Sequence, residues 1–189
     1  MPVIFLNGCT SSGKTSICRE LQSQLPTPYL RLGIDDAFAM LPPQLHNNPD
    51  GFFFDTDQLG DVRLNYGSFG WNMLKAHARV ARTIVDHGLD LILDEVLIDD
   101  DIKQDWANVL ADTDVFMVGV HCALPELERR ERERGDRLIG QARGQFTRVH
   151  TGMRYDLEID TTKTLPLESA AKIVSALTDR PAEGMKSFA

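Results

Sequence analysis

The sequence predicts an α/β fold, in which helices cover both faces of a parallel sheet. Strand-like and helix-like runs alternate along the chain, and a glycine-rich motif joins the first strand to the first helix. Alternation of this kind is typical of parallel sheets, because each crossover between parallel strands needs a connection of helix length. With 189 residues and 42% hydrophobic content, we expect one domain over residues 1–180 and a flexible tail over 181–189.

Five apolar runs are expected to form the strands. They span residues 3–7, 29–34, 89–96, 115–121 and 156–160. Helical spacing or helix boundary signals predict helices over residues 14–25, 36–41, 68–87, 99–110, 125–134 and 168–177. The helix over 68–87 has the strongest pattern, and Gly88 is its expected stop.

Two segments do not follow the alternation. Residues 44–65 are polar apart from Phe52-Phe53-Phe54, and we expect an insertion that could form a hairpin near the mouth of the sheet. Residues 129–146 are expected to form a lid, whose part over 135–146 is either a mobile loop or a broken helix. Three glycines and few large apolar residues in that part predict that the lid is not ordered without ligand.

The most informative motif fits G-x-x-x-x-G-K-[ST] and directly follows the first strand. Its residues, with the next one along the chain, are Gly8, Cys9, Thr10, Ser11, Ser12, Gly13, Lys14, Thr15 and Ser16. A loop of this kind wraps backbone N–H groups around nucleotide phosphates, and the helix that follows points its positive end at the same anion. A chance match in a Gly/Ser-rich turn is the alternative, but the strand before the motif favours a phosphate-binding loop for ATP or GTP.

The same motif predicts a site for phosphoryl transfer with Mg²⁺. Lys14 would reach the β- and γ-phosphates, and the Thr15 hydroxyl would ligate Mg²⁺. Asp94 ends an apolar strand and is the expected acid of the Mg²⁺ shell, unless it is simply a solvated acid at a strand end. Glu95 is open to two interpretations: it activates water in a hydrolase, or it faces the acceptor or the core in a transferase.

An acidic pair follows the second strand, at the edge of the sheet where open α/β folds bind ligands. A carboxylate there could accept the proton of an attacking hydroxyl. We assign that role of general base to Asp35 and a helix-capping role to Asp36. The alternative is that both acids only serve the start of the helix.

An arginine-rich run spans residues 129–137. Spacing of i,i+4 from acids predicts surface ion pairs in this run, which fits Arg129 and Arg130 best. Arg134 and Arg137 flank a glycine where helix gives way to loop. Arginines at such a place can clamp the transferring phosphoryl group.

Composition limits the classes of partner. A formal net charge of −8 argues against nucleic acid, which needs clustered basic side chains. Three widely spaced cysteines give no disulfide or zinc pattern, and no signal peptide or membrane span is visible, so we expect a cytoplasmic protein. The five histidines show no metal spacing.

Taken in order, several motifs resemble the chloramphenicol phosphotransferases over nearly the whole chain. They are Asn7-Gly8 with Gly13-Lys14-Thr15, Gly33-Ile34-Asp35, Leu93-Asp94-Glu95-Val96, Arg134-Gly135-Asp136-Arg137 and Tyr155-Asp156-Leu157-Glu158-Ile159-Asp160-Thr161-Thr162. The resemblance implies a fold like that of nucleoside monophosphate kinases, with a five-stranded parallel core. It also implies ATP- and Mg²⁺-dependent phosphorylation of a small-molecule hydroxyl, with Asp35 as base and Arg134 and Arg137 on the phosphates.

The family pattern is not matched everywhere. The loop Gly-Cys-Thr-Ser-Ser-Gly-Lys-Thr replaces the usual Gly-Gly-Ser-Ser-Ala-Gly-Lys-Ser, and Asp94-Glu95 replaces a common Asp-Asp pair. Residues 36–72, which would line the acceptor pocket, diverge most. The leading hypothesis is a small-molecule kinase whose acceptor lies between Asp35, residues 38–54, Phe69 and Trp71. An NTP hydrolase and a nucleotide-binding regulatory module are the alternatives.

Overall fold

A parallel five-stranded sheet forms the centre of the computed structural model, which describes residues 3–135 and 138–179. The strand order is β2-β5-β1-β6-β7, and every neighbouring pair is parallel. The strands are β1 (Val3–Gly8), β2 (Tyr29–Gly33), β5 (Asp90–Glu95), β6 (Val115–His121) and β7 (Leu157–Asp160). The predicted α/β class and the five parallel strands are confirmed.

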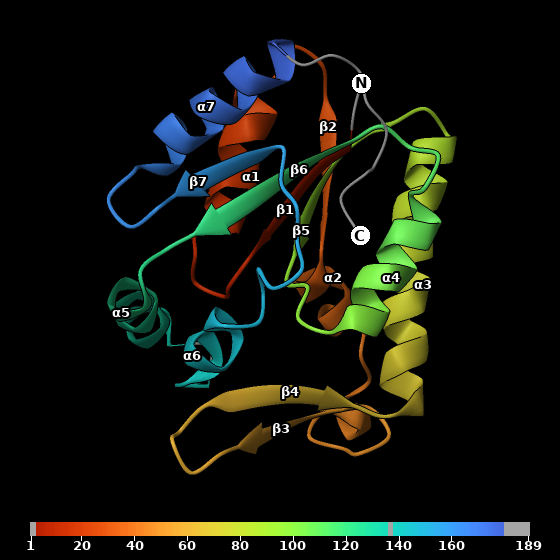
Figure 1. The fold of residues 1–189 in the computed structure, drawn as a ribbon. Helices are drawn as coiled ribbons and strands as arrows, with labels where there is room; N and C mark the ends of the chain where they lie inside the picture. Colours follow the sequence, from red (N-terminus) through yellow and green to blue (C-terminus); the bar gives the residue numbers. More distant parts are fainter. Residues whose placement is uncertain (1–2, 136–137, 180–189) are drawn as a thin grey trace.

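Helices cover both faces of this sheet (Figure 1). On one face lie α1 (Lys14–Gln24) and α7 (Pro166–Thr178), and on the other lie α3 (Ser68–Asp86) and α4 (Asp100–Val109). Alternation along β1 supplies both cores: Ile4 and Leu6 pack towards α1 and α7, whereas Val3 and Phe5 pack towards α3 and α4. All six residues of β1 are buried, as expected for a central strand covered on both sides.

An antiparallel hairpin lies beyond the carboxyl ends of the strands (Figure 1). It pairs β3 (Phe52–Thr56) with β4 (Val62–Tyr66), and short helices α2 (Ile34–Ala39) and η1 (Pro43–Leu45) connect it to the sheet. The segment expected as an insertion is therefore a hairpin. Phe52 is buried against Phe38 with ring centroids 4.7 Å apart, which ties the hairpin to α2.

The lid region consists of α5 (Leu124–Arg134) and α6 (Gln141–Phe146). Of the two predictions for its second half, the broken helix is correct and the loop is wrong for residues 141–146. In Figure 1, α6 lies beside the hairpin, and a Cβ added at Gly144 would come within 2.2 Å of the Val62 carbonyl oxygen. Small residues thus allow α6 to dock closely. Arg137 and the predicted flexible tail over 181–189 lie outside the described residues.

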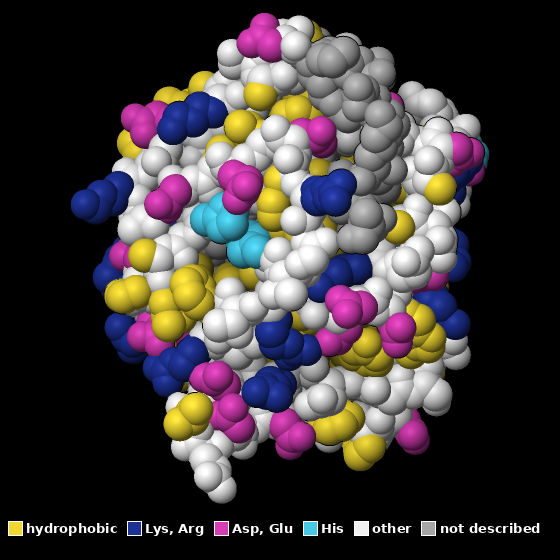
Figure 2. All heavy atoms as spheres, viewed as in Figure 1, with side chains coloured by type: hydrophobic (Ala, Val, Ile, Leu, Met, Phe, Trp, Pro, Cys, Tyr) yellow, Lys and Arg dark blue, Asp and Glu magenta, His cyan; other side chains and the backbone are white. Residues whose placement is uncertain are grey.

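Charged side chains are interspersed on the surface. Figure 2 shows Lys and Arg side chains alternating with Asp and Glu over one face, rather than gathered into a continuous basic stripe. Among the described residues, no helix is both long and apolar enough to cross a bilayer.

Candidate active site

The glycine-rich loop joins β1 to α1 as the motif requires. Gly13 adopts a φ of 94°, which favours glycine, and it immediately precedes α1. A Cβ at Gly8 would lie 2.4 Å from the Val120 carbonyl oxygen, so the loop can leave the sheet only with glycine there. The start of α1 then faces the space above the loop, where backbone N–H groups and the helix dipole favour an anion.

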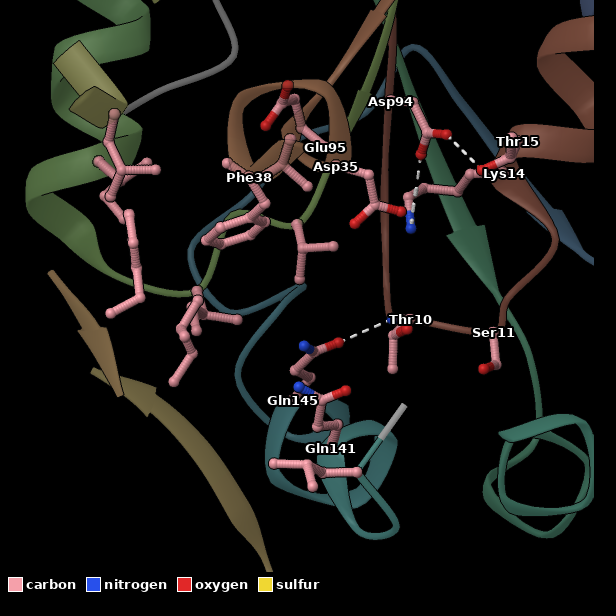
Figure 3. Close-up of a pocket in the computed structure, with 18 of the residues that line it drawn as sticks. Thr10, Ser11, Lys14, Thr15, Asp35, Phe38, Asp94, Glu95, Gln141 and Gln145 are labelled. Atoms are coloured by element: carbon pink, nitrogen blue, oxygen red, sulfur yellow. Dashed lines mark hydrogen bonds and ion pairs between the residues drawn. The ribbon is translucent and has the colours of Figure 1, made fainter. Parts of the chain in front are cut away.

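Three side chains meet at the inner end of this loop (Figure 3). The ammonium of Lys14 donates to the carbonyl oxygens of Gly8 and Cys9, both at 2.9 Å, and lies 3.8 Å from the Asp94 carboxylate. The Thr15 hydroxyl donates to Oδ2 of Asp94 at 2.6 Å. Lys14 and Asp94 are only 6% and 7% exposed, so their charges interact with little screening by solvent.

These residues fit a Mg²⁺ site of the phosphoryl-transfer type. Mg²⁺ prefers oxygen ligands and is commonly held by one or two side chains together with substrate phosphates and water. Thr15 Oγ1 and Asp94 Oδ2 are two adjacent oxygens of the right kind. Within residues 3–135 and 138–179, no three His, Cys, Asp or Glu side chains gather into a larger metal site.

Buried side chains at the end of β1 and after β7 hold the phosphate loop in its conformation. Asn7, fully buried, donates to the Val149 carbonyl and to the Tyr155 hydroxyl at 2.8 Å each, and accepts from the Leu97 N–H at 2.9 Å. The Thr161 hydroxyl donates to the Ser12 carbonyl at 2.7 Å. A buried amide with three such partners fixes the strand end from which the loop departs.

The loop opens into a cavity of about 810 Å³. Thr10, Ser11, Gly13, Lys14, Thr15 and Ser16 line one part of it, and Asp94 and Glu95 line its wall. The predicted loop residues Gly8, Cys9 and Ser12 lie outside the lining. Much of the remaining lining comes from α2, the hairpin, α3, the segment between β5 and α4, α4 and the lid. It includes Ile34, Asp35, Phe38, Phe52, Phe54, Leu64, Tyr66, Leu74, His77, Ile98, Ile102 and Trp106.

The two adjacent acids after β2 have different surroundings. Asp36 accepts from the Gly33 N–H at 2.7 Å and from the Arg31 guanidinium at 2.8 and 2.9 Å. It therefore occupies the capping role predicted for it, although from the third position of the helix rather than the first. Asp35, in the first turn of α2, lines the cavity, which is the placement that a general base requires.

Glu95 is buried in a pair with a histidine that the sequence did not single out. Its Oε1 lies 2.7 Å from Nε2 of His77, and the two residues are 2% and 3% exposed. Burial raises the pKa of Glu95, and the Glu95 carboxylate raises the pKa of His77 despite the opposing effect of burial. Figure 3 shows the Asp94 carboxylate facing Lys14 and Thr15, whereas that of Glu95 points away from them.

The lid arginines fall into surface and cavity-lining residues in a way that differs from the expectation. Arg129 is exposed and pairs with Glu126 and Glu133, as predicted. Arg130 also pairs with Glu126, yet it lines the cavity and its Nη2 donates to the Thr161 carbonyl at 2.7 Å. Arg134, one turn further along α5, lines the same cavity. The ion pair predicted for Arg130 is therefore present, and the structure adds a place in the cavity lining that the sequence did not predict.

A second contact between lid and loop comes from α6. The Thr10 N–H donates to Oε1 of Gln145 at 2.7 Å (Figure 3). Glu131, fully buried in α5, accepts from the Gly140 and Ala142 N–H groups at 2.8 Å each. The carboxylate thus joins α5 to the start of α6.

The aromatic lining of the cavity also differs from the expectation. Phe38, Phe52 and Phe54 line it, but Phe69 and Trp71 do not. Trp71 stacks on Tyr66 with ring centroids 6.0 Å apart, and Phe69 is 46% exposed. Trp106, which packs edge-on against Phe5 of the core, lines the cavity instead.

Solved structures with this fold are kinases in several cases. The chain aligns with the APS kinase CysC of Mycobacterium tuberculosis, solved with AMPPNP and APS, at 17% identity and a TM-score of 0.66, covering 94% of this chain and 97% of that one. It aligns with a tunicamycin resistance protein of Deinococcus radiodurans at 16% identity and a TM-score of 0.61, covering 100% and 98%. It aligns with shikimate kinase of Aquifex aeolicus at 14% identity and a TM-score of 0.53, covering 93% of this chain and 96% of that one. The fold and the site together define the class of P-loop kinases, enzymes that phosphorylate a hydroxyl acceptor.

The family follows from closer matches. The model of the family described as "Chloramphenicol phosphotransferase-like protein" matches residues 1–178. A Mycobacterium tuberculosis protein named "Putative O-phosphotransferase" is 33% identical over 178 residues, which are 90% of this chain and 79% of that protein. The chain belongs to the chloramphenicol phosphotransferase-like family.

Proposed function

We propose that this protein transfers the γ-phosphate of ATP, with Mg²⁺, to a hydroxyl of a small ring-bearing molecule of the chloramphenicol type. The observation that carries the proposal is that the phosphate loop, Asp35 and three phenylalanines line one and the same cavity. A nucleotide on the loop and an acceptor among the aromatic side chains would be in direct contact. Enzymes of this kind act mainly by positioning and by stabilising charge.

The residues take the following roles in this proposal. Loop N–H groups and Lys14 bind the phosphates, and Thr15 and Asp94 hold Mg²⁺, which supplies charge neutralisation between the β- and γ-phosphates. Asp35 accepts the proton of the acceptor hydroxyl. Arg134 and Arg137 are the two arginines predicted to stabilise the transferring group, and Arg130, which lines the cavity beside Arg134, joins them in this role.

A hydrolase would need Glu95 to activate water near the loop. The hydrogen bond to His77 and the orientation of the Glu95 carboxylate, away from Lys14 and Thr15, favour the kinase instead. The pair lies where the cavity meets α3, so its role would be to orient a polar group of the acceptor or to hold the cavity wall.

The experiment is a screen of hydroxylated acceptors with radiolabelled ATP, including chloramphenicol, followed by variants against the best acceptor. Asp35→Asn should lower transfer by about 10²- to 10⁴-fold while nucleotide affinity stays unchanged. Asp55→Asn, an exposed acid of the hairpin, is the matched control and should leave transfer unchanged. The kinase mechanism is wrong if Glu95→Gln abolishes all turnover while Asp35→Asn has no effect.

A further inference from the structure

Gln145 connects the lid directly to the phosphate loop. A backbone N–H can only donate, so the side-chain atom that lies 2.7 Å from the Thr10 nitrogen must be the carbonyl oxygen Oε1 of Gln145. The two N–H donors of Nε2 then face elsewhere, and Figure 3 shows Nε2 turned away from Thr10. Nε2 has no hydrogen-bond partner among the described residues. Gln145 lines the cavity, so these donors are available to a ligand there.

The contact is not needed to dock α6. Two hydrogen bonds to Glu131 already hold the start of this helix, and the Val62 N–H donates to the Gly140 carbonyl at 3.1 Å. Close packing of Gly144 against Val62 adds a third attachment. A glutamine that reaches from a well-held helix to a loop amide is therefore better explained by a ligand than by docking.

Gln141 provides a second observation at the same place. It lies one turn before Gln145 on α6, and Figure 3 shows both side chains facing the loop. Oε1 of Gln141 is buried and has no hydrogen-bond partner among the described residues. A buried unsatisfied oxygen is costly and calls for a donor. A phosphate at neutral pH carries acceptors alone, so the donor to Gln141 would be water or another part of the ligand rather than the γ-phosphate.

The position of the contact on the loop indicates which part of the ligand it meets. Lys14 and Thr15 lie at the inner end of the loop, where α1 begins. Thr10 lies at the outer end, beside the lid. A group bound by Gln145 there would be the last phosphate of the nucleotide rather than those deeper in the loop.

We propose that Gln145 extends the phosphate-binding loop, by accepting the Thr10 N–H and donating from Nε2 to the γ-phosphate of a bound nucleoside triphosphate. The inference rests on the proposed function, since it requires a triphosphate on the loop. It makes Gln145 a residue that distinguishes triphosphate from diphosphate. Because Glu131 joins α6 to α5, the arginines of α5 and Gln145 would engage the same phosphate together.

The test measures binding and needs no acceptor. Affinities for Mg²⁺-ADP and for Mg²⁺ with a non-hydrolysable imido analogue of ATP are measured by calorimetry on the full chain. Gln145→Ala should weaken binding of the analogue about tenfold or more, because a hydrogen bond to a charged group is lost, and change ADP affinity by less than about threefold. Gln145→Glu should weaken binding of the analogue further, since the substitution places a negative charge beside the γ-phosphate.

Gln104→Ala, an exposed glutamine of α4, is the control and should change neither affinity. Thermal unfolding of each variant shows that the fold is retained. An equal loss of affinity for both nucleotides in Gln145→Ala would assign Gln145 a structural role. Tighter binding of the analogue by this variant would mean that Gln145 hinders phosphate binding. Either result overturns the inference. If the wild-type protein binds neither nucleotide, the proposed function is overturned as well. If the wild-type protein binds both nucleotides and Gln145→Ala changes neither affinity, only this inference is overturned.

Discussion

His150 illustrates how a single half-buried side chain behind the loop can make stability depend on pH. Its Nδ1 lies 2.7 Å from the Tyr155 hydroxyl, whose oxygen accepts from Asn7, so the hydroxyl hydrogen is directed to a neutral histidine. The His121 ring stacks on His150 with centroids 3.9 Å apart. Burial first, and then the neighbouring His121 and Lys14, lower the pKa of His150 to about 4.

This lowered pKa predicts a loss of stability in mild acid. Between pH 6.5 and 4 the unfolded chain binds a proton at His150 that the folded chain does not, so the free energy of unfolding falls as pH falls. Because His150 is only half-buried, solvent screening keeps the loss below about 3 kcal/mol, which the full pKa difference would give. Denaturant unfolding at pH 7 and pH 4 should give a smaller pH dependence for His150→Gln than for wild type. The exposed His87→Gln is the control, and an unchanged pH dependence in His150→Gln would contradict the assignment.

The sequence located those residues whose roles are set by local spacing. Lys14, Thr15 and Asp94 come together as predicted, because the motif and the neighbouring strand end determine their positions. Arg130 was assigned to surface pairing because acids and arginines alternate at i,i+4 spacing in its run; it pairs with Glu126 and still reaches the cavity. Spacing within one helix cannot show which face meets another segment.

At the scale of elements, two helices and a hairpin surround the mouth of the cavity. The contacts between α6 and β4 depend on backbone approach at Gly140 and Gly144, and those between α5 and α6 depend on Glu131. A glycine-rich and charged stretch therefore contains a docked helix, which was one of the two predictions for residues 135–146. That the lid is not ordered without ligand stays a prediction. The sequence could not single out Glu131 as a buried acceptor, because its six charged neighbours within residues 128–134 are exposed or half-buried.

Glu131→Ala should loosen the second half of the lid. The substitution leaves two buried N–H groups without their acceptor, at a cost of about 1–3 kcal/mol each when they stay buried. Hydrogen exchange over residues 138–146 should accelerate, while exchange in β1 and β5 stays at its wild-type rate. Glu133→Ala, an exposed acid two residues along α5, should not change exchange in 138–146. Unchanged protection in Glu131→Ala would show that the hairpin alone holds α6.

The sequence predicted that the inserted segment lies near the mouth of the sheet, but it could not predict the contacts by which the hairpin docks. Its existence follows from a polar segment with an aromatic burst, but its docking depends on long-range contacts such as that of Phe52 with Phe38. The acceptor side of the cavity was therefore predicted only in part. Trp71 faces the hairpin residue Tyr66, whereas Trp106 of α4 reaches the cavity.

At the scale of the whole molecule, nucleotide binding should appear as a gain in thermal stability. The loop joins β1 to α1, and its side-chain partners are Asp94 of β5, Thr161 directly after β7 and Gln145 of α6. A ligand on the loop is therefore coupled to elements across the sheet. A ligand at 100 times its Kd adds about 2.7 kcal/mol to the free energy of unfolding. For a chain of this size the melting temperature should rise by about 5–10 °C.

Scanning calorimetry with Mg²⁺-ATP tests this expectation. Lys14→Ala should abolish most of the shift, because the β- and γ-phosphates lose their cation. Lys172→Ala, an exposed lysine of α7, should retain it. Chelation of Mg²⁺ by EDTA should reduce the shift in wild type; a full shift without the metal would show that Thr15 and Asp94 do not hold it.

The shared cavity described above has a stereochemical consequence. In the proposed reaction, donor and acceptor bound side by side would let the alcohol attack phosphorus directly, opposite the departing ADP oxygen, so that no covalent phosphoenzyme needs to form. One such in-line displacement inverts the configuration of the three remaining oxygens at phosphorus. Product made from ATP that is chiral at the γ-phosphorus through oxygen isotopes should therefore have inverted configuration, whereas retention would reveal two successive transfers through an enzyme side chain.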